Sequence, residues 1–139
     1  LFRSLKLSMV YDQDKGDFQK GMELITDLID KSKGIEGMER VLANSYNVLG
    51  ETLKSLRRFN EASEAFEKSS NYYLQLGDKK MGVATKSMGC SAILEMKQTQ
   101  QGITCFEDAY QLAKKELGEN DTMTESILEY TYLLKKQQE

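Results

Sequence analysis

Few side chains in this sequence could take part in catalysis or bind a metal. Histidine is absent from the 139 residues, and the cysteines are Cys90 and Cys105. A cysteine–histidine nucleophile and a mixed cysteine–histidine zinc site both need an imidazole. We therefore expect no enzyme and no cofactor. We also expect the two cysteines to be reduced thiols that pack as small core residues, as in an intracellular, cytoplasmic protein.

A short acidic segment contains Asp12, Asp14 and Asp17, and Glu23 follows eleven residues after Asp12. A calcium-binding loop between two helices needs an acidic or amide ligand at its fifth position and glycine at its sixth. Here Gly16 comes fifth and Asp17 sixth, which is the reverse order. The segment therefore predicts a turn between two helices and no metal site.

The overall composition is typical of an all-helical protein. Proline is absent, and the helix-forming residues Leu, Lys, Glu, Gln, Met and Ala are common. The charge is nearly balanced, with 19 basic and 22 acidic residues, and a nucleic-acid-binding surface would need a basic excess. No apolar run approaches the roughly 20 residues that span a bilayer. We expect neither nucleic-acid binding nor membrane insertion.

Apolar residues at three- and four-residue spacing, interrupted by short polar turns, predict seven helices. We expect them at about residues 1–13, 18–32, 38–56, 61–76, 79–97, 99–117 and 122–139. Gly34, Gly77 and Gly118 recur after the second, fourth and sixth of them, which indicates helices arranged in pairs. The turns are too short for an inter-domain linker, so we expect one domain over residues 1–139. Because the chain begins inside a predicted helix and not at Met, we expect it to be a fragment of a longer protein.

One pattern of small and large residues occurs twice in the sequence. Ala62-x-x-x-Phe66-x-x-Ser69 is followed forty residues later by Gly102-x-x-x-Phe106-x-x-Ala109. Small residues let two helices approach closely, and the phenylalanine fills the space beside that contact. A fixed period of this length indicates a stack of repeated helix pairs. We align Gly50 of the second predicted pair with Gly89 of the third, with one extra residue in the turn of the third pair.

The pattern resembles the tetratricopeptide repeat, whose second helix carries Ala-x-x-x-Phe-x-x-Ala. The second repeat, in the helices predicted at about residues 38–56 and 61–76, is similar through Tyr46, Leu49, Gly50 and Leu53, together with Ala62, Phe66 and Ser69. The period near forty residues resembles the long-repeat branch of the kinesin-light-chain and spindle-adaptor type. The resemblance implies an all-α solenoid of antiparallel helix pairs, with about three and a half repeats in seven helices.

The resemblance also implies a partner-binding groove, because the first helices of such repeats line the concave face and bind a peptide or helix. The corresponding residues here are Met9, Gln13, Asn44, Asn47, Glu51, Lys54, Lys86, Cys90 and Ile93, accompanied by Leu5, Asp12, Ser55, Val83 and Leu94. The family's clamp for two carboxylates needs Lys and Asn across successive repeats. Asn47 and Lys86 fit it in part, but Glu51 stands where a second Asn is needed.

Three functions remain open from the sequence. We expect a protein–protein interaction scaffold or adaptor, associated with the cytoskeleton, a cilium or a motor. The alternative is a structural segment of a larger solenoid or complex that binds no free peptide; an exposed apolar last helix would favour it. A regulatory part of an enzyme is a remote third possibility. The oligomeric state and the identity of the partner do not follow from the sequence.

Overall fold

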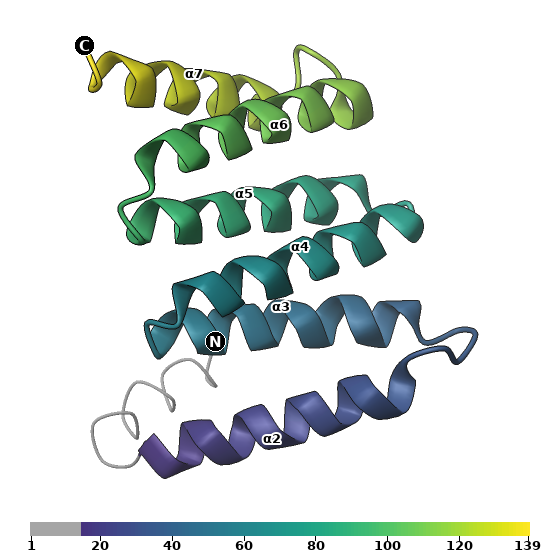
Figure 1. The fold of residues 1–139 in the computed structure, drawn as a ribbon. Helices are drawn as coiled ribbons and strands as arrows, with labels where there is room; N and C mark the ends of the chain where they lie inside the picture. Colours follow the sequence, from purple (N-terminus) through teal and green to yellow (C-terminus); the bar gives the residue numbers. More distant parts are fainter. Residues whose placement is uncertain (1–14) are drawn as a thin grey trace.

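The computed structural model describes residues 15–139, which form six α-helices and no strand (Figure 1). The helices are α2 (Lys15–Ser32), α3 (Glu39–Ser55), α4 (Phe59–Gln75), α5 (Lys79–Glu95), α6 (Thr99–Leu117) and α7 (Thr122–Lys136). The predicted helix at residues 1–13 lies outside the described residues, and so do Leu5, Met9, Asp12 and Gln13. The all-helical prediction is confirmed over the described part of the chain.

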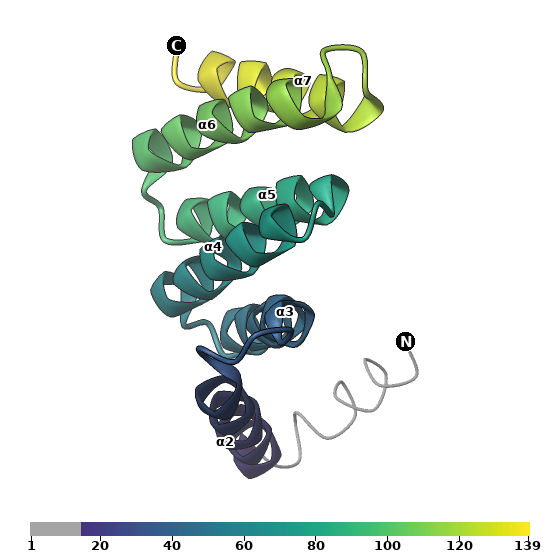
Figure 2. The ribbon, with the colours of Figure 1, turned by 90° about the vertical axis from the view of Figure 1, so that its right-hand side faces the viewer.

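The helices are stacked in the order in which they occur in the sequence. Each packs antiparallel against the one before it, so that the stack rises from α2 to α7 in both views (Figures 1 and 2). Helices α3 and α5 begin at Glu39 and Lys79, and α4 and α6 begin at Phe59 and Thr99. The offset is forty residues in both cases. The extra residue that we expected in the turn of the third pair, between α5 and α6, is therefore not present.

Residues with a positive φ angle follow several of the helices. Gly77 (φ 80°) and Gly118 (φ 96°) end α4 and α6, where glycine adopts a positive φ without a steric penalty. Arg57 (φ 61°) and Lys97 (φ 63°) take the same conformation after α3 and α5, although neither is a glycine. The sequence gives no signal for this feature. It repeats at the forty-residue offset, which shows that the two turns have the same geometry.

Two groups of buried side chains form the core. The first group extends over α2, α3, α4 and α5 and includes Leu42, Tyr46, Leu53 and Phe66. The second joins α5, α6 and α7, and its buried members are Val83, Cys90, Ile103, Phe106, Ala109, Ala113, Ile127 and Leu134. Phe66 and Phe106, the two phenylalanines of the repeated pattern, are both buried. Each helix pair therefore buries its apolar surface against its neighbours in the stack, as expected for a solenoid.

Candidate partner-binding face

One face of α3 carries a row of four polar side chains. Asn44, Asn47, Glu51 and Lys54 follow one another at three- and four-residue intervals, so they lie on the same side of the helix. Asn44, Glu51 and Lys54 are exposed and Asn47 is half-buried. Within residues 15–139, neither Glu51 nor Lys54 takes part in an ion pair. We call these four residues the polar row.

The side-chain oxygen of Asn44 accepts a hydrogen bond, whereas that of Asn47 does not. The Tyr73 hydroxyl on α4 donates to Asn44 Oδ1 at 2.6 Å. Burial raises the pKa of Tyr73, and the nearby negative charge of Asp78 raises it further, so the hydroxyl stays protonated and can donate. Asn47 Oδ1 is buried and has no hydrogen-bond partner within the described residues. The Asn47 side chain is nevertheless engaged with Tyr73, because a hydrogen bond from it to the hydroxyl lowers the pKa of Tyr73 and so opposes part of the increase.

The equivalent face of α5 differs from the one that we predicted. Adding the forty-residue offset to the polar row gives Ala84, Ser87, Ser91 and Leu94. The predicted residues Val83 and Cys90 are fully buried, so neither can contribute to an open partner-binding surface. Like Asn47, Ser87 has a buried side-chain oxygen with no hydrogen-bond partner in the described part of the chain.

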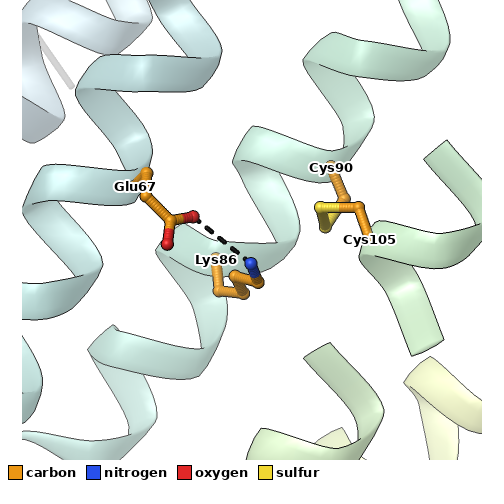
Figure 3. Close-up of a disulfide and its surroundings, with 4 residues drawn as sticks. All are labelled: Glu67, Lys86, Cys90 and Cys105. Atoms are coloured by element: carbon orange, nitrogen blue, oxygen red, sulfur yellow. Dashed lines mark hydrogen bonds and ion pairs between the residues drawn. A yellow bond between two sulfur atoms is a disulfide. The ribbon is translucent and has the colours of Figure 1, made fainter. Parts of the chain in front are cut away.

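Lys86 and Ile93, two further residues predicted for this face, belong to another side of α5. Lys86 Nζ lies 3.3 Å from Glu67 Oε1 on α4, and the Lys86 side chain is only 18% exposed (Figure 3). Ile93 is half-buried and lies two helical turns beyond Lys86, on the same side of α5. Lys86 therefore pairs with the neighbouring helix in this structure.

Gly89 explains why the sequence suggested the wrong register. A Cβ atom at Gly89 would lie 3.4 Å from both Phe66 Cβ and Ser63 O, so this glycine faces backwards to α4. Gly50 faces forwards along the stack, where a Cβ atom would lie 2.8 Å from two ring carbons of Phe66. The residue of α5 that faces forwards, to α6, is Cys90. The two glycines are thus not equivalent, and the predicted register was one residue out.

The prediction of free thiols is also wrong, because a disulfide joins Cys90 of α5 to Cys105 of α6 (Figure 3). Their Cα atoms are 5.4 Å apart, and no free cysteine occurs in the structure. The sequence places both residues where the two helices come closest, but it does not give their relative rotation. The expectation of a reducing, cytoplasmic environment rested partly on free thiols and loses that support.

A cavity of about 300 Å³ opens between α5, α6 and α7. Its lining consists of Ala84 and Ser87 from α5, Phe106 from α6, and Met123, Ser126, Ile127 and Tyr130 from α7. We call it the α5–α7 pocket. Ala84 and Ser87 are the α5 equivalents of Asn44 and Asn47, so the pocket lies on the continuation of the polar row. The pocket could not be predicted from the sequence, because its walls come from three helices whose relative positions were unknown.

Other kinds of site find no support in residues 15–139. No group of three or more histidine, cysteine, aspartate or glutamate residues there could hold a metal ion. None of the helices in this part of the chain is long and apolar enough to cross a membrane.

Comparison with known proteins supports the pairing of α3 with α4 as one repeat. A family model for the tetratricopeptide repeat matches residues 43–73, which cover most of α3 and α4. Searches of curated proteins and of solved structures found no match. Tetratricopeptide repeats generally mediate protein–protein interactions, and the polar row lies on the first helix of the matched repeat.

Proposed function

We propose that this protein is an interaction scaffold or adaptor that binds a peptide or helix of another protein on the face formed by α3, α5 and α7. The polar row is the observation that carries the proposal. It presents Glu51 and Lys54 with no ion-pair partner in the described residues, and it keeps Asn47 with an unpaired buried oxygen. Exposed polar residues without a packing role are available to recognise a partner.

Three finer assignments are also proposals. The forty-residue offset supports the long-repeat branch of the kinesin-light-chain and spindle-adaptor type. From that resemblance we propose a cytoplasmic adaptor associated with the cytoskeleton or a cilium. We also propose that residues 1–139 fold as one domain.

A charge exchange on the polar row tests the proposed function. The double variant Glu51→Lys, Lys54→Glu keeps the net charge and alters two exposed side chains, so its thermal stability should stay close to that of wild type. In a pull-down from lysate with quantitative mass spectrometry, it should lose the partners that wild type captures.

The matched control exchanges charge on α6, where Asp108 and Lys115 are exposed and form no ion pair within the described residues. The variant Asp108→Lys, Lys115→Glu should keep those partners. Loss of the partners in the α6 variant together with their retention in the polar-row variant would contradict the proposal.

One observation favours the structural alternative. Helix α7 exposes large apolar side chains, including Leu128 (49%), Tyr132 (58%) and Leu133 (50%). Exposed apolar surface of this kind often marks an interface. Both charge exchanges could leave the captured proteins unchanged while a Tyr132→Lys, Leu133→Glu variant releases them. That result would favour the structural role over partner binding on the polar row.

A further inference from the structure

The side of α7 that packs into the stack repeats the spacing that α5 uses for the same purpose. On α5, the side that faces α4 carries four small or polar buried residues, which are Gly82, Thr85, Gly89 and Ala92. The buried residues of α7 have the same spacing and are Thr124, Ile127, Thr131 and Leu134. From Gly82 to Thr124, and from Gly89 to Thr131, is 42 residues. This offset relates every position of α7 to its equivalent on α5.

The side of α7 that faces onward along the stack is not covered by any helix of residues 15–139. Helix α7 packs on α6 and is the last helix of the stack in both views (Figures 1 and 2). On α3 the onward-facing residues are buried beneath α4, and they are Ala43, Tyr46, Gly50 and Leu53. Their equivalents on α7 are all exposed, and they are Glu125, Leu128, Tyr132 and Lys135. We call these last four residues the α7 end face.

The α7 end face does not suit a further helix packed as α4 packs on α3. That close approach depends on Gly50, where a Cβ atom would lie 2.8 Å from the ring of Phe66. Tyr132 occupies the equivalent position on α7, so its side chain would hold an incoming helix farther away. Leu128 lies one turn before Tyr132, and together they form an apolar centre with a charged residue beyond each end.

The residues of the α7 end face are arranged symmetrically about Tyr130. Leu128 and Tyr132 lie two residues before and after it, and Glu125 and Lys135 lie five residues before and after it. A second α7 placed antiparallel on this face therefore brings each leucine to a tyrosine and each glutamate to a lysine. A parallel placement would instead bring like charges together.

The two charged residues are available for such pairing. Glu125 is exposed and takes part in no ion pair within the described residues. Lys135 pairs with Glu107 of α6, but its side chain remains 53% exposed. Because a lysine ammonium group has three donors, Lys135 can bind a second carboxylate while it keeps the first.

We propose that two copies of this chain associate through the α7 end face, with their α7 helices antiparallel across a two-fold axis near Tyr130. The same surface is used by both copies, so the association closes at two. Helix α7 has 15 residues and is about 22 Å long, so the interface is small and the dimer is weak. The association does not depend on the proposed function. Together with it, the dimer presents two polar rows and can bind a partner bivalently.

Mixing two charge-reversed variants tests the proposal on the purified chain alone. In sedimentation velocity, wild type should change from monomer to dimer as its concentration rises. Glu125→Lys places a lysine opposite Lys135 of the other copy, and Lys135→Glu places a glutamate opposite Glu125. Each variant alone should therefore dimerise about tenfold more weakly. An equal mixture of the two variants restores opposite charges at both ends, so it should form heterodimers about as readily as wild type forms dimers.

Two further variants serve as controls. Glu64 is exposed on α4 and takes part in no ion pair within residues 15–139, so Glu64→Lys should dimerise like wild type. Leu128→Asp should abolish the dimer, because it places an unpaired charge against Tyr132 of the other copy. Thermal melting of each variant confirms that it is folded.

Several results would overturn the proposal. Wild type that stays monomeric at every concentration, or a single charge reversal that dimerises like wild type, would show that the α7 end face does not bind a second copy. A mass that keeps growing beyond the dimer would show open-ended stacking. A mixture of variants that stays monomeric, while wild type dimerises, would contradict the antiparallel arrangement. No other protein is present in these measurements, so their failure leaves the test of the polar row unaffected.

Discussion

Phe66 lies where three helices meet, between Gly50 of α3 and Gly89 of α5. Its side chain is fully buried, and the space for its ring exists because Gly50 has no side chain. The sequence predicted this contact correctly, since small residues opposite a phenylalanine are a local pattern. It could not show that Gly89 of α5 lies next to the Cβ atom of Phe66, because that approach depends on how successive pairs stack.

Gly50 and Gly21 form a matched pair for testing this packing. A Cβ atom at Gly50 would lie 2.8 Å from Phe66, whereas nothing lies within 4 Å of one at Gly21. Both glycines are inside helices, so alanine gains about 1 kcal/mol of helix propensity at either position. Overpacking against the buried ring should offset that gain and leave Gly50→Ala about 1–3 kcal/mol less stable than Gly21→Ala. Urea unfolding measures the difference, and equal midpoints would contradict the contact.

Lys97 offers a second test at the scale of one residue. It follows α5 with φ at 63°, a conformation that costs a non-glycine residue about 1–2 kcal/mol. Lys97→Gly should therefore raise the free energy of unfolding by about 0.5–1 kcal/mol, because the steric gain exceeds the entropy that glycine loses on folding. Thermal unfolding checks this. Destabilisation would show that the turn does not hold Lys97 in the left-handed region.

At the scale of the helices, the sequence predicted where each helix begins and ends better than it predicted which side of the helix is buried. The bounds of α3, α4, α5 and α6 agree with the predictions to within about two residues, because glycine and polar turns mark the ends locally. The predicted register of α5 was wrong by one residue, because we aligned Gly89 with Gly50 although Cys90 is the equivalent residue. A shift of one residue turns a helix by about 100°, which is enough to exchange an exposed face for a buried one. This shift is why Val83 and Cys90 were expected on the surface and Ala84 and Ser87 were not.

The disulfide between α5 and α6 makes a prediction at the same scale. It closes a loop over a sequence separation of 15 residues, for which the constraint on the unfolded chain is worth about 3 kcal/mol. The double variant Cys90→Ala, Cys105→Ala should be less stable than wild type by about that amount. A reducing agent should lower the urea midpoint of wild type and leave that of the variant unchanged. A wild-type midpoint that does not respond to reduction, with two titratable thiols in the unfolded protein, would restore the original prediction.

Across the whole molecule, the face of α3, α5 and α7 changes character along the stack. It is polar on α3, where Asn44, Asn47, Glu51 and Lys54 lie. It becomes small and apolar on α5 and α7, where the α5–α7 pocket opens. The sequence predicted these four residues for partner binding from the repeat pattern, and that role stays a prediction. It could not predict the pocket, which forms only when three helices are placed together.

The most direct test of the account is to ask which face of the stack touches a partner in solution. A photoreactive benzoylphenylalanine is placed at one exposed position at a time, at Asn44 or Glu51 on α3 and at Glu64 or Asn71 on α4, and the protein is irradiated in lysate. The account predicts covalent adducts of one partner from the α3 positions and none from the α4 positions. Adducts from α4 alone would contradict the claim that the face of α3, α5 and α7 binds the partner.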